Sequence, residues 1–234
     1  MIKLGLVGRD ISHSQSQAMY ESILGQEVDY HLLDFENAQE VESLDLIFKN
    51  KYLGISVTYP YKQHFNSQVS INDDVVKKLG AINCIRLRNL TYEATNTDYL
   101  AAKHLLKTEF FEFENFIILG SGNMAKVFEE LLKNSDRELL LLSRKTHGDL
   151  NQVNYEDQVD RKDKKTLIIN CCSRDFIFRQ EIPKKSLFWD MNYNFKGHAS
   201  FKSNSLNYLD GLNLLRWQAK FALDFWDIAQ PRNS

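Results

Sequence analysis

Short apolar runs and segments of helical spacing alternate along the first hundred residues, with polar loops between them. Strands are predicted over Ile2–Val7, Val28–Phe35, Leu53–Thr58 and in a hairpin of Asn83–Arg88 with Tyr92–Asn96, and helices over Gln17–Leu24, up to Lys51, over Ile71–Leu79 and over Tyr99–Leu106. Alternation of buried strands with helices is typical of an α/β fold, in which helices cover a largely parallel sheet.

The same alternation returns after a central Gly-x-Gly turn. Strands are predicted over Phe116–Leu119, Glu138–Leu142, Thr166–Asn170 and Leu187–Met191, with a helix from the turn to about Lys133. One glycine allows a tight bend and the next lets a pyrophosphate approach bare backbone at the positive end of a helix. Gly120, Ser121, Gly122, Asn123 and Met124 are therefore the candidate dinucleotide-binding segment, although an ordinary turn between a buried strand and a helix has a similar sequence.

Polar residues of the first hundred gather where the predicted strands end. They are Ser14, Ser16, Thr58, Lys62, Asn83, Asn96 and Asp98. Loops at the carboxyl ends of strands bind ligands in open α/β sheets. Each residue also has a purely structural interpretation: Ser14 with Gln17 fits a helix capping box, Asp98 fits a helix N-cap, and Lys62 fits a surface cation.

Composition excludes several classes of function. The net charge of −2, from 29 basic and 31 acidic residues, creates no field that attracts nucleic acid or an anionic membrane. Three cysteines without metal or redox spacing and six scattered histidines predict no metal site, and reduced thiols favour the cytoplasm. The apolar opening is too short for a signal peptide or a membrane span. A length of 234 residues allows one large domain or two small ones, and the central turn favours two.

Four motifs in order resemble the shikimate dehydrogenase family. Ser12–Ser16 is similar to the family's His-Ser-x-Ser loop, and Ser56–Lys62 to its Asn-Val-Thr-x-Pro-x-Lys segment. Gly80–Cys84 is similar to Gly-Ala-x-Asn-Thr, and Asn96–Asp98 matches the Asn-Thr-Asp that opens the helix between the two domains. Four ordered matches are far more specific than one glycine turn.

The resemblance implies a two-domain enzyme that reduces 3-dehydroshikimate to shikimate with NADPH, a step of aromatic amino acid biosynthesis. The expected substrate domain is 1–98, completed by 212–234, and the expected Rossmann-like dinucleotide-binding domain is 99–211, with the active site in the cleft between them. Lys62 and Asp98 are the expected acid/base pair. The expected substrate-binding residues are Ser14, Ser16, Thr58, Asn83, Tyr193 and Gln218.

The resemblance extends to the cofactor side. Ser143, Arg144 and Lys145 follow the second strand of the nucleotide domain, where an acidic residue suits NAD and basic residues suit the 2′-phosphate of NADP; solvated surface charge is the alternative. Asp190–Tyr193 resembles the family's Asp-x-x-Tyr segment near the nicotinamide. Asp210–Phe221 resembles its Gly-x-x-Met-Leu-x-x-Gln stretch. Met191, Gly211 and Leu214 are thus expected at the cofactor. Gln218, four residues after Leu214, shares its helical face; capping of a buried backbone group is its alternative role.

The chain departs from the family pattern at a few positions. Gln17 replaces a proline, Ala94 and Ala101 replace glycines, and Asn170–Arg174 matches its family segment only in part. Two alternatives stay open: a related enzyme acting on quinate or another polyol, with NAD, and a dinucleotide-binding sensor without turnover. The expected partners are small molecules, and the chain is expected to act as a monomer or a homodimer.

Overall fold

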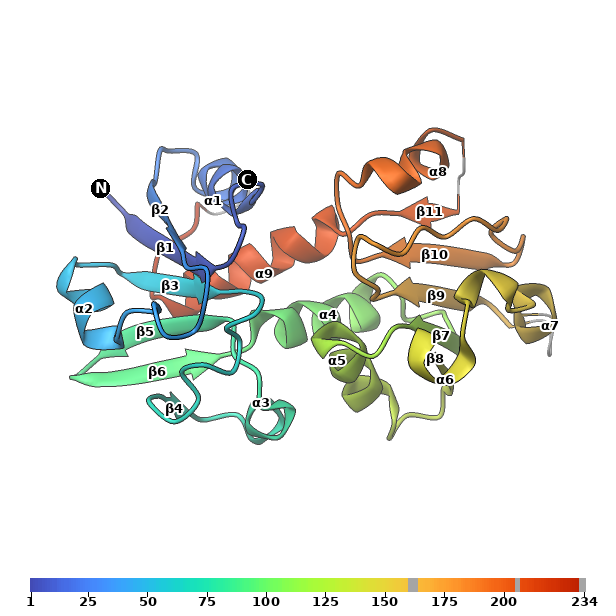
Figure 1. The fold of residues 1–234 in the computed structure, drawn as a ribbon, viewed down its shortest axis with the longest axis horizontal. Helices are drawn as coiled ribbons and strands as arrows, with labels where there is room; N and C mark the ends of the chain where they lie inside the picture. The colour runs from blue at the N-terminus through green and yellow to red at the C-terminus, as the bar shows by residue number, and fades with distance from the viewer. Residues whose placement is uncertain (160–163, 205–206, 232–234) are drawn as a thin grey trace. The chain divides into compact units, whose positions relative to one another are not determined.

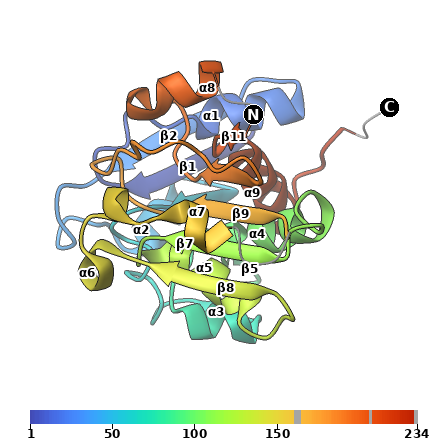
Figure 2. The same ribbon diagram turned by 90° about the vertical axis from the view of Figure 1, so that its right-hand side faces the viewer.

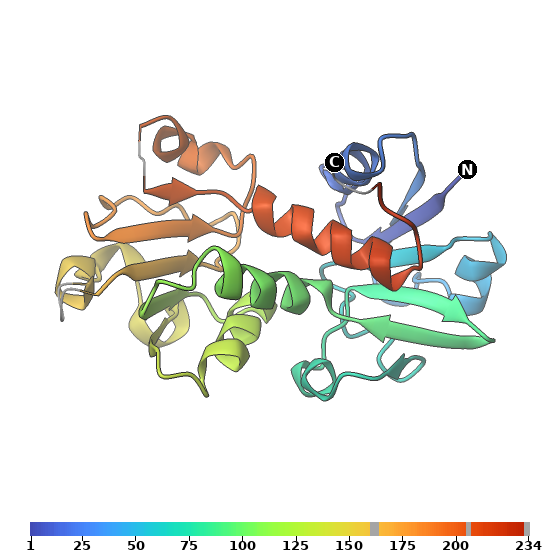
Figure 3. The same cartoon turned by 180° about the vertical axis from the view of Figure 1, so that it is seen from behind.

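The chain divides into two compact units. The computed structural model describes residues 1–159, 164–204 and 207–231. The first unit contains residues 1–101 and the segment from Leu215 onward, and the second contains residues 102–214. The chain passes from one unit to the other inside two continuous helices, α4 (Thr97–Thr108) and α9 (Leu212–Phe225), which Figure 3 shows from behind.

The first unit is built on a six-stranded sheet in the order β2-β1-β3-β5-β6-β4 (Figure 1). The strands are β1 (Lys3–Gly8), β2 (Asp29–Asp34), β3 (Gly54–Val57), β4 (Ser70–Ile71), β5 (Cys84–Arg88) and β6 (Thr91–Thr95), and the helices are α1 (Ser16–Leu24), α2 (Leu44–Lys49) and α3 (Asp74–Leu79). β1 runs parallel to β2 and β3, whereas β5 is antiparallel to β3 and β6. The mixed sheet therefore gathers the ends of β1, β2 and β3 at one edge.

The C-terminal segment completes the core of the first unit. Leu223 and Trp226 pack with Leu4 of β1 and Tyr20 of α1. Gly54 makes this possible, because a Cβ there would lie 2.1 Å from the indole of Trp226, whose Nε1 donates to the Ile85 carbonyl at 3.1 Å. The burial of these apolar surfaces ties the end of the chain to its beginning.

Local sequence explains where the predicted elements of this unit end. The hairpin turns at Asn89 and Leu90, which both have positive φ, as a two-residue turn between twisted strands requires. The helix predicted from Ile71 instead begins at Asp74, because the Asp73 carboxylate accepts hydrogen bonds from the first backbone N–H groups and Ile71 pairs in β4.

The second unit is a five-stranded sheet in the order β11-β10-β9-β7-β8, whose pairs are all parallel (Figure 2). The strands are β7 (Asn115–Leu119), β8 (Glu138–Leu142), β9 (Thr166–Asn170), β10 (Ser186–Asp190) and β11 (Tyr208–Leu209), the helices are α5 (Asn123–Leu132), α6 (Arg144–His147), α7 (Tyr155–Val159) and α8 (Ala199–Asn204), and single 3-10 turns lie at Leu150–Gln152 and Lys196–His198. The order reverses at β7, as in a doubly wound Rossmann-like sheet. The predicted α/β fold is confirmed.

Candidate functional site

The loop after β1 carries the two predicted substrate serines and is fixed by a carboxylate of β2. Asp34 accepts the backbone N–H of Asp10 at 2.9 Å and that of Ile11 at 3.1 Å. The Ser14 hydroxyl donates to the Ser16 hydroxyl at 3.2 Å and accepts the Ser16 backbone N–H at 3.3 Å. Both hydroxyls are partly exposed and lie at the start of α1. The structure therefore brings the two serines together where a small anion can reach them.

The capping-box interpretation of this loop is wrong. The residue before α1 is Gln15, and no side chain forms a cap hydrogen bond there. Gln17 instead reaches along the exposed helix surface to Glu21 at 3.0 Å. The serine hydroxyls bond to each other and to one backbone N–H, so they have hydrogen-bonding capacity left for a ligand.

Lys62 and Asp98 form a buried ion pair. Nζ of Lys62 donates to Oδ2 of Asp98, and the two side chains are only 16% and 7% exposed. The Lys62 carbonyl accepts the backbone N–H of Ile82 at 2.8 Å, which fixes the loop after β3 against the segment before β5. Two predicted site residues that are 36 positions apart thus meet in the folded unit.

Two asparagines fix the backbone next to this pair. Oδ1 of Asn83 accepts the backbone N–H of Thr97 at 2.6 Å. Asn96 donates to the Ala81 carbonyl at 2.8 Å and accepts the Tyr99 backbone N–H at 3.0 Å, so Asn96 caps α4. The suggestion that Asp98 is only an N-cap is wrong, since Asp98 lies inside the first turn of α4 and pairs with Lys62.

The remaining predicted substrate residues lie in two loops and one helix. Thr58 follows β3, its N–H donates to the Val7 carbonyl at 2.8 Å, and its methyl group packs against Gly8. Gln218 is a partly buried residue of α9. Tyr193 follows β10 in the second unit, where its carbonyl accepts a hydrogen bond from Arg174 at 2.7 Å. Their role in binding substrate stays a prediction.

The Gly-x-Gly turn has the geometry that a phosphate site needs. Gly120 has φ +115°, and a Cβ there would lie 3.1 Å from the Cys171 backbone. Gly122 begins α5 without a side-chain cap, and nothing lies within 4 Å of the position its Cβ would take. Ser121, Gly122 and Asn123 are exposed and Met124 is partly buried. The open backbone at this helix N-terminus fits a pyrophosphate.

The predicted 2′-phosphate site follows β8. Ser143 caps the short helix α6 by accepting the Thr146 N–H at 3.3 Å. Arg144 and Lys145 are exposed in its first turn. The Arg144 guanidinium donates to the Asp175 carboxylate at 3.2 and 3.3 Å. The sequence did not predict that Asp175 lies at this site. Its position in the loop after strand β9, at the ligand-binding edge of the sheet, could have indicated it.

Two of the cofactor residues expected near the end of the second unit, Met191 and Gly211, lie where two backbone segments pack closely. A Cβ on Gly211 would lie 2.4 Å from the Met191 carbonyl oxygen, so only glycine fits against this strand end. Leu214 is buried in the first turn of α9. The structure therefore places Met191 and Gly211 side by side.

Two absences concern the described residues alone. Within ranges 1–159, 164–204 and 207–231, no group of His, Cys, Asp or Glu side chains is arranged to hold a metal ion. Among the helices in these ranges, none is both long and apolar enough to cross a bilayer.

Comparisons with known proteins agree with this fold. The architecture defines a two-unit α/β protein with a Rossmann-like second unit. Residues 6–85 match the model of the shikimate dehydrogenase substrate binding domain. The resemblance to the shikimate dehydrogenase family that the motifs predicted is confirmed by this match.

Individual relatives support the same conclusion. A Clostridium botulinum protein named shikimate dehydrogenase (NADP(+)) is 26% identical over 97% of this chain and 96% of its own length. A Clostridium beijerinckii protein of the same name is 30% identical over 68% of this chain and 60% of its own. The structure of shikimate dehydrogenase from Aquifex aeolicus matches with a TM-score of 0.74 at 24% identity, over 96% of this chain and 92% of that one.

Proposed function

We propose that this protein is an oxidoreductase that catalyses the reversible NADPH-dependent reduction of 3-dehydroshikimate to shikimate in aromatic amino acid biosynthesis. The observation that carries the proposal is the buried Lys62–Asp98 pair, in the unit whose residues 6–85 match a shikimate dehydrogenase substrate binding domain. The names of the relatives agree with it, since they are called shikimate dehydrogenase (NADP(+)).

In the proposed reaction, Lys62 transfers the proton and Asp98 holds its ammonium. When bound, the nicotinamide supplies or accepts the hydride. The Lys62 ammonium donates a proton to the oxygen of the carbonyl that is reduced, and the deprotonated amine accepts it in the reverse direction. Asp98 points the ammonium and shares its charge, since the two side chains bond directly.

The substrate is held by groups of complementary chemistry. Ser14 and Ser16 would bind the carboxylate through their hydroxyls, which lie 3.2 Å apart. Thr58, Asn83, Tyr193 and Gln218 would bind the hydroxyls and ring. Hydroxyl and amide side chains suit a polyol because each can donate and accept.

The dinucleotide would bind to the second unit. Gly120, Ser121, Gly122, Asn123 and Met124 would hold the pyrophosphate, and Ser143, Arg144 and Lys145 would hold the 2′-phosphate. Met191, Gly211 and Leu214 would lie on the nicotinamide side. The open backbone of the turn and the guanidinium of Arg144 support these roles.

The finer organisation is also part of the proposal. We assign residues 1–98 and 212–234 to substrate binding and 99–211 to NADP binding. We place the protein in the cytoplasm and expect it to act as a monomer or a homodimer with small-molecule ligands.

A panel of two substrates and two cofactors tests the function. The purified chain should oxidise shikimate with NADP, and kcat/KM should be lower with quinate or with NAD. Higher kcat/KM with quinate and NAD would favour the related polyol enzyme. Binding of a dinucleotide without turnover of either substrate would favour a sensor.

A further inference from the structure

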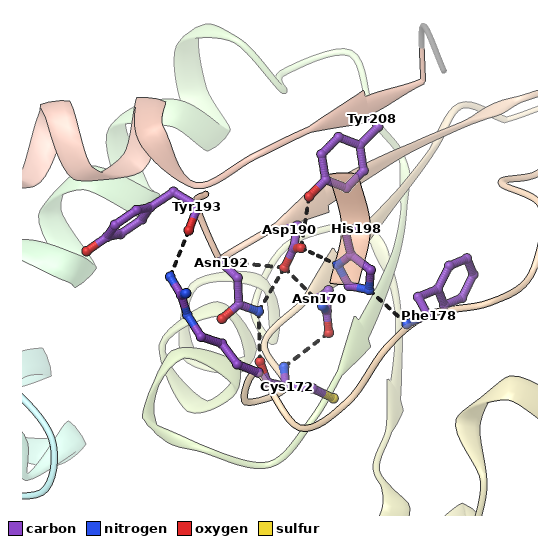
Figure 4. A network of polar contacts seen from close by, with 9 residues as sticks. Asn170, Cys172, Phe178, Asp190, Asn192, Tyr193, His198 and Tyr208 are labelled. Carbon is purple, nitrogen blue, oxygen red and sulfur yellow. Dashed lines mark hydrogen bonds and ion pairs between the residues drawn. The ribbon is translucent and has the colours of Figure 1, made fainter. Parts of the chain in front are cut away.

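The Asp190 carboxylate at the end of β10 is the centre of a buried polar network (Figure 4). Its Oδ1 accepts from Asn170 Nδ2 at 2.9 Å and from the backbone and side-chain nitrogens of Asn192 at 3.0 Å each. Its Oδ2 accepts from His198 Nδ1 at 2.6 Å and from the Tyr208 hydroxyl at 2.9 Å. Asp190 and His198 are both fully buried at their side chains.

His198 and Tyr208 can each act only as a hydrogen-bond donor toward the Asp190 carboxylate. The backbone N–H of Phe178 donates to His198 Nε2 at 2.8 Å, so Nε2 is the acceptor and Nδ1 carries the proton that points at Asp190. Burial, together with the nearby Asp190 carboxylate, raises the pKa of Tyr208 far above its usual range, so its hydroxyl stays a donor. The network therefore has one arrangement in which its polar atoms are satisfied.

The network fixes two loops at the carboxyl edge of the second sheet. Asn170 accepts the Cys172 backbone N–H at 3.2 Å, and Asn192 donates to the Cys172 carbonyl at 3.1 Å. The loop after β9 is thus joined to the loop after β10. The first of these loops also lies against the Gly-x-Gly turn, because a Cβ on Gly120 would lie 3.1 Å from the Cys171 backbone.

The side chains predicted to contact ligand lie just outside the network. Met191 and Tyr193 flank Asn192, and Figure 4 shows the Tyr193 side chain pointing away from Asp190. The strand-end loops of a doubly wound sheet are where its ligand binds. The Asp190 carboxylate bonds to Asn170 and Asn192, which hold both loops. It can therefore set the positions of the Met191 and Tyr193 side chains without touching the ligand.

We propose that Asp190, His198 and Tyr208 are positioning residues. They hold the two strand-end loops in the position that contacts the nicotinamide half of a bound dinucleotide. This inference rests on the proposed function. It assigns a positioning role to Asp190, which opens the Asp190–Tyr193 segment, and to His198 and Tyr208, which lie outside the motifs. Because the nicotinamide half is common to both cofactors, weakening the network affects NADP and NAD to the same degree. Removing Arg144, in contrast, affects NADP alone.

Tyr208→Phe is the variant that tests this role, because it removes one of the hydrogen bonds to Asp190 and keeps the ring. Tyr155→Phe is the matched control: it removes a buried hydroxyl that donates to the Leu150 carbonyl at 2.9 Å in the core of the same unit. Dissociation constants for NADP and NAD are measured for both variants by fluorescence titration, with melting temperatures alongside.

Tyr208→Phe should weaken the binding of both dinucleotides by about tenfold, which is the low end for a hydrogen bond to a charged group. Tyr155→Phe should lower the melting temperature comparably and leave both constants unchanged. Amide exchange at Cys172 and Asn192 should also quicken in Tyr208→Phe alone. Equal dissociation constants in the two variants would overturn the inference while leaving the proposed function standing. A wild-type chain that binds neither dinucleotide would contradict both.

Discussion

Arg144 is the residue on which the choice of cofactor depends in this account. Ser173, by its hydroxyl, and Arg144, by its guanidinium, hold the pKa of Asp175 below its usual range, so Asp175 is a charged partner of Arg144 at neutral pH. A 2′-phosphate must share or displace this exposed carboxylate. Substituting Arg144 and Asp175 one at a time therefore distinguishes the effect of the positive charge on NADP binding from that of the negative charge.

Arg144→Ala should raise the KM for NADP by about tenfold or more and leave the KM for NAD nearly unchanged, because only NADP carries the phosphate. Asp175→Asn should lower the KM for NADP, by no more than about fivefold, since an exposed ion pair is weak. Steady-state kinetics with both cofactors check this, with Arg179→Ala as a control for loss of an exposed positive charge. Equal effects of Arg144→Ala on both cofactors would sink the assignment of the 2′-phosphate site.

Among the elements, the turn between β7 and α5 contains two glycines, and each position favours glycine for a different physical reason. Gly120 is needed for its backbone conformation, since φ is +115° and a Cβ would lie 3.1 Å from the Cys171 carbonyl oxygen. Gly122 has an ordinary φ of −78° and open space around its Cβ position. The open space at this position fits a ligand that approaches the Gly122 backbone.

The pair Gly120→Ala and Gly122→Ala tests this division. Gly120→Ala should cost about 1–3 kcal/mol of unfolding free energy, the usual range for backbone strain. Gly122→Ala should leave the melting temperature unchanged and weaken binding of NADP and NAD together, because its methyl group covers the backbone that the pyrophosphate approaches. Thermal melts and titrations check both. Unchanged dinucleotide binding in Gly122→Ala would remove the turn from the cofactor site.

The sequence predicted long elements well and short ones poorly. β9 has the predicted bounds, Thr166–Asn170. Every residue of this strand is buried, so its apolar run marks both of its ends. The two-residue strands β4 and β11 and the short helices α6, α7 and α8 were not predicted. Such pieces have few local hydrogen bonds and form only through tertiary contacts. The start of α3 has a different reason: the Asp73 side chain caps the helix before Asp74, and Ile71 pairs in β4.

In the whole molecule, the motifs predicted that Lys62 and Asp98 lie close together, but they did not predict the hydrogen bonds that fix the surrounding loops. Lys62 and Asp98 come from two different motifs and lie 36 positions apart in the chain. The hydrogen bonds of Asp34, which anchors the serine loop, and of the Asp190 network could not be predicted from the sequence, because their partners come from other strand ends and loops. Acidic residues at the carboxyl ends of parallel strands were the one available hint.

In the proposed reaction, Lys62 transfers a proton while Asp98 holds the Lys62 ammonium in place. The most direct measurement is the turnover number for shikimate oxidation by NADP in wild type, Lys62→Ala, Asp98→Asn and the double variant. Lys77→Ala serves as the control, because Lys77 pairs with Asp74 at 3.0 Å on the exposed surface of α3.

We expect Lys62→Ala to lower kcat by about 10²–10⁴-fold, the usual contribution of a positioned acid or base, with NADP affinity unchanged. Asp98→Asn should also slow turnover, and the double variant should be little slower than the poorer single one, since either change disables the same unit. Lys77→Ala should match wild type. Near-normal turnover by Lys62→Ala would contradict the proposed mechanism, and fully multiplicative losses in the double variant would contradict the joint role of the pair.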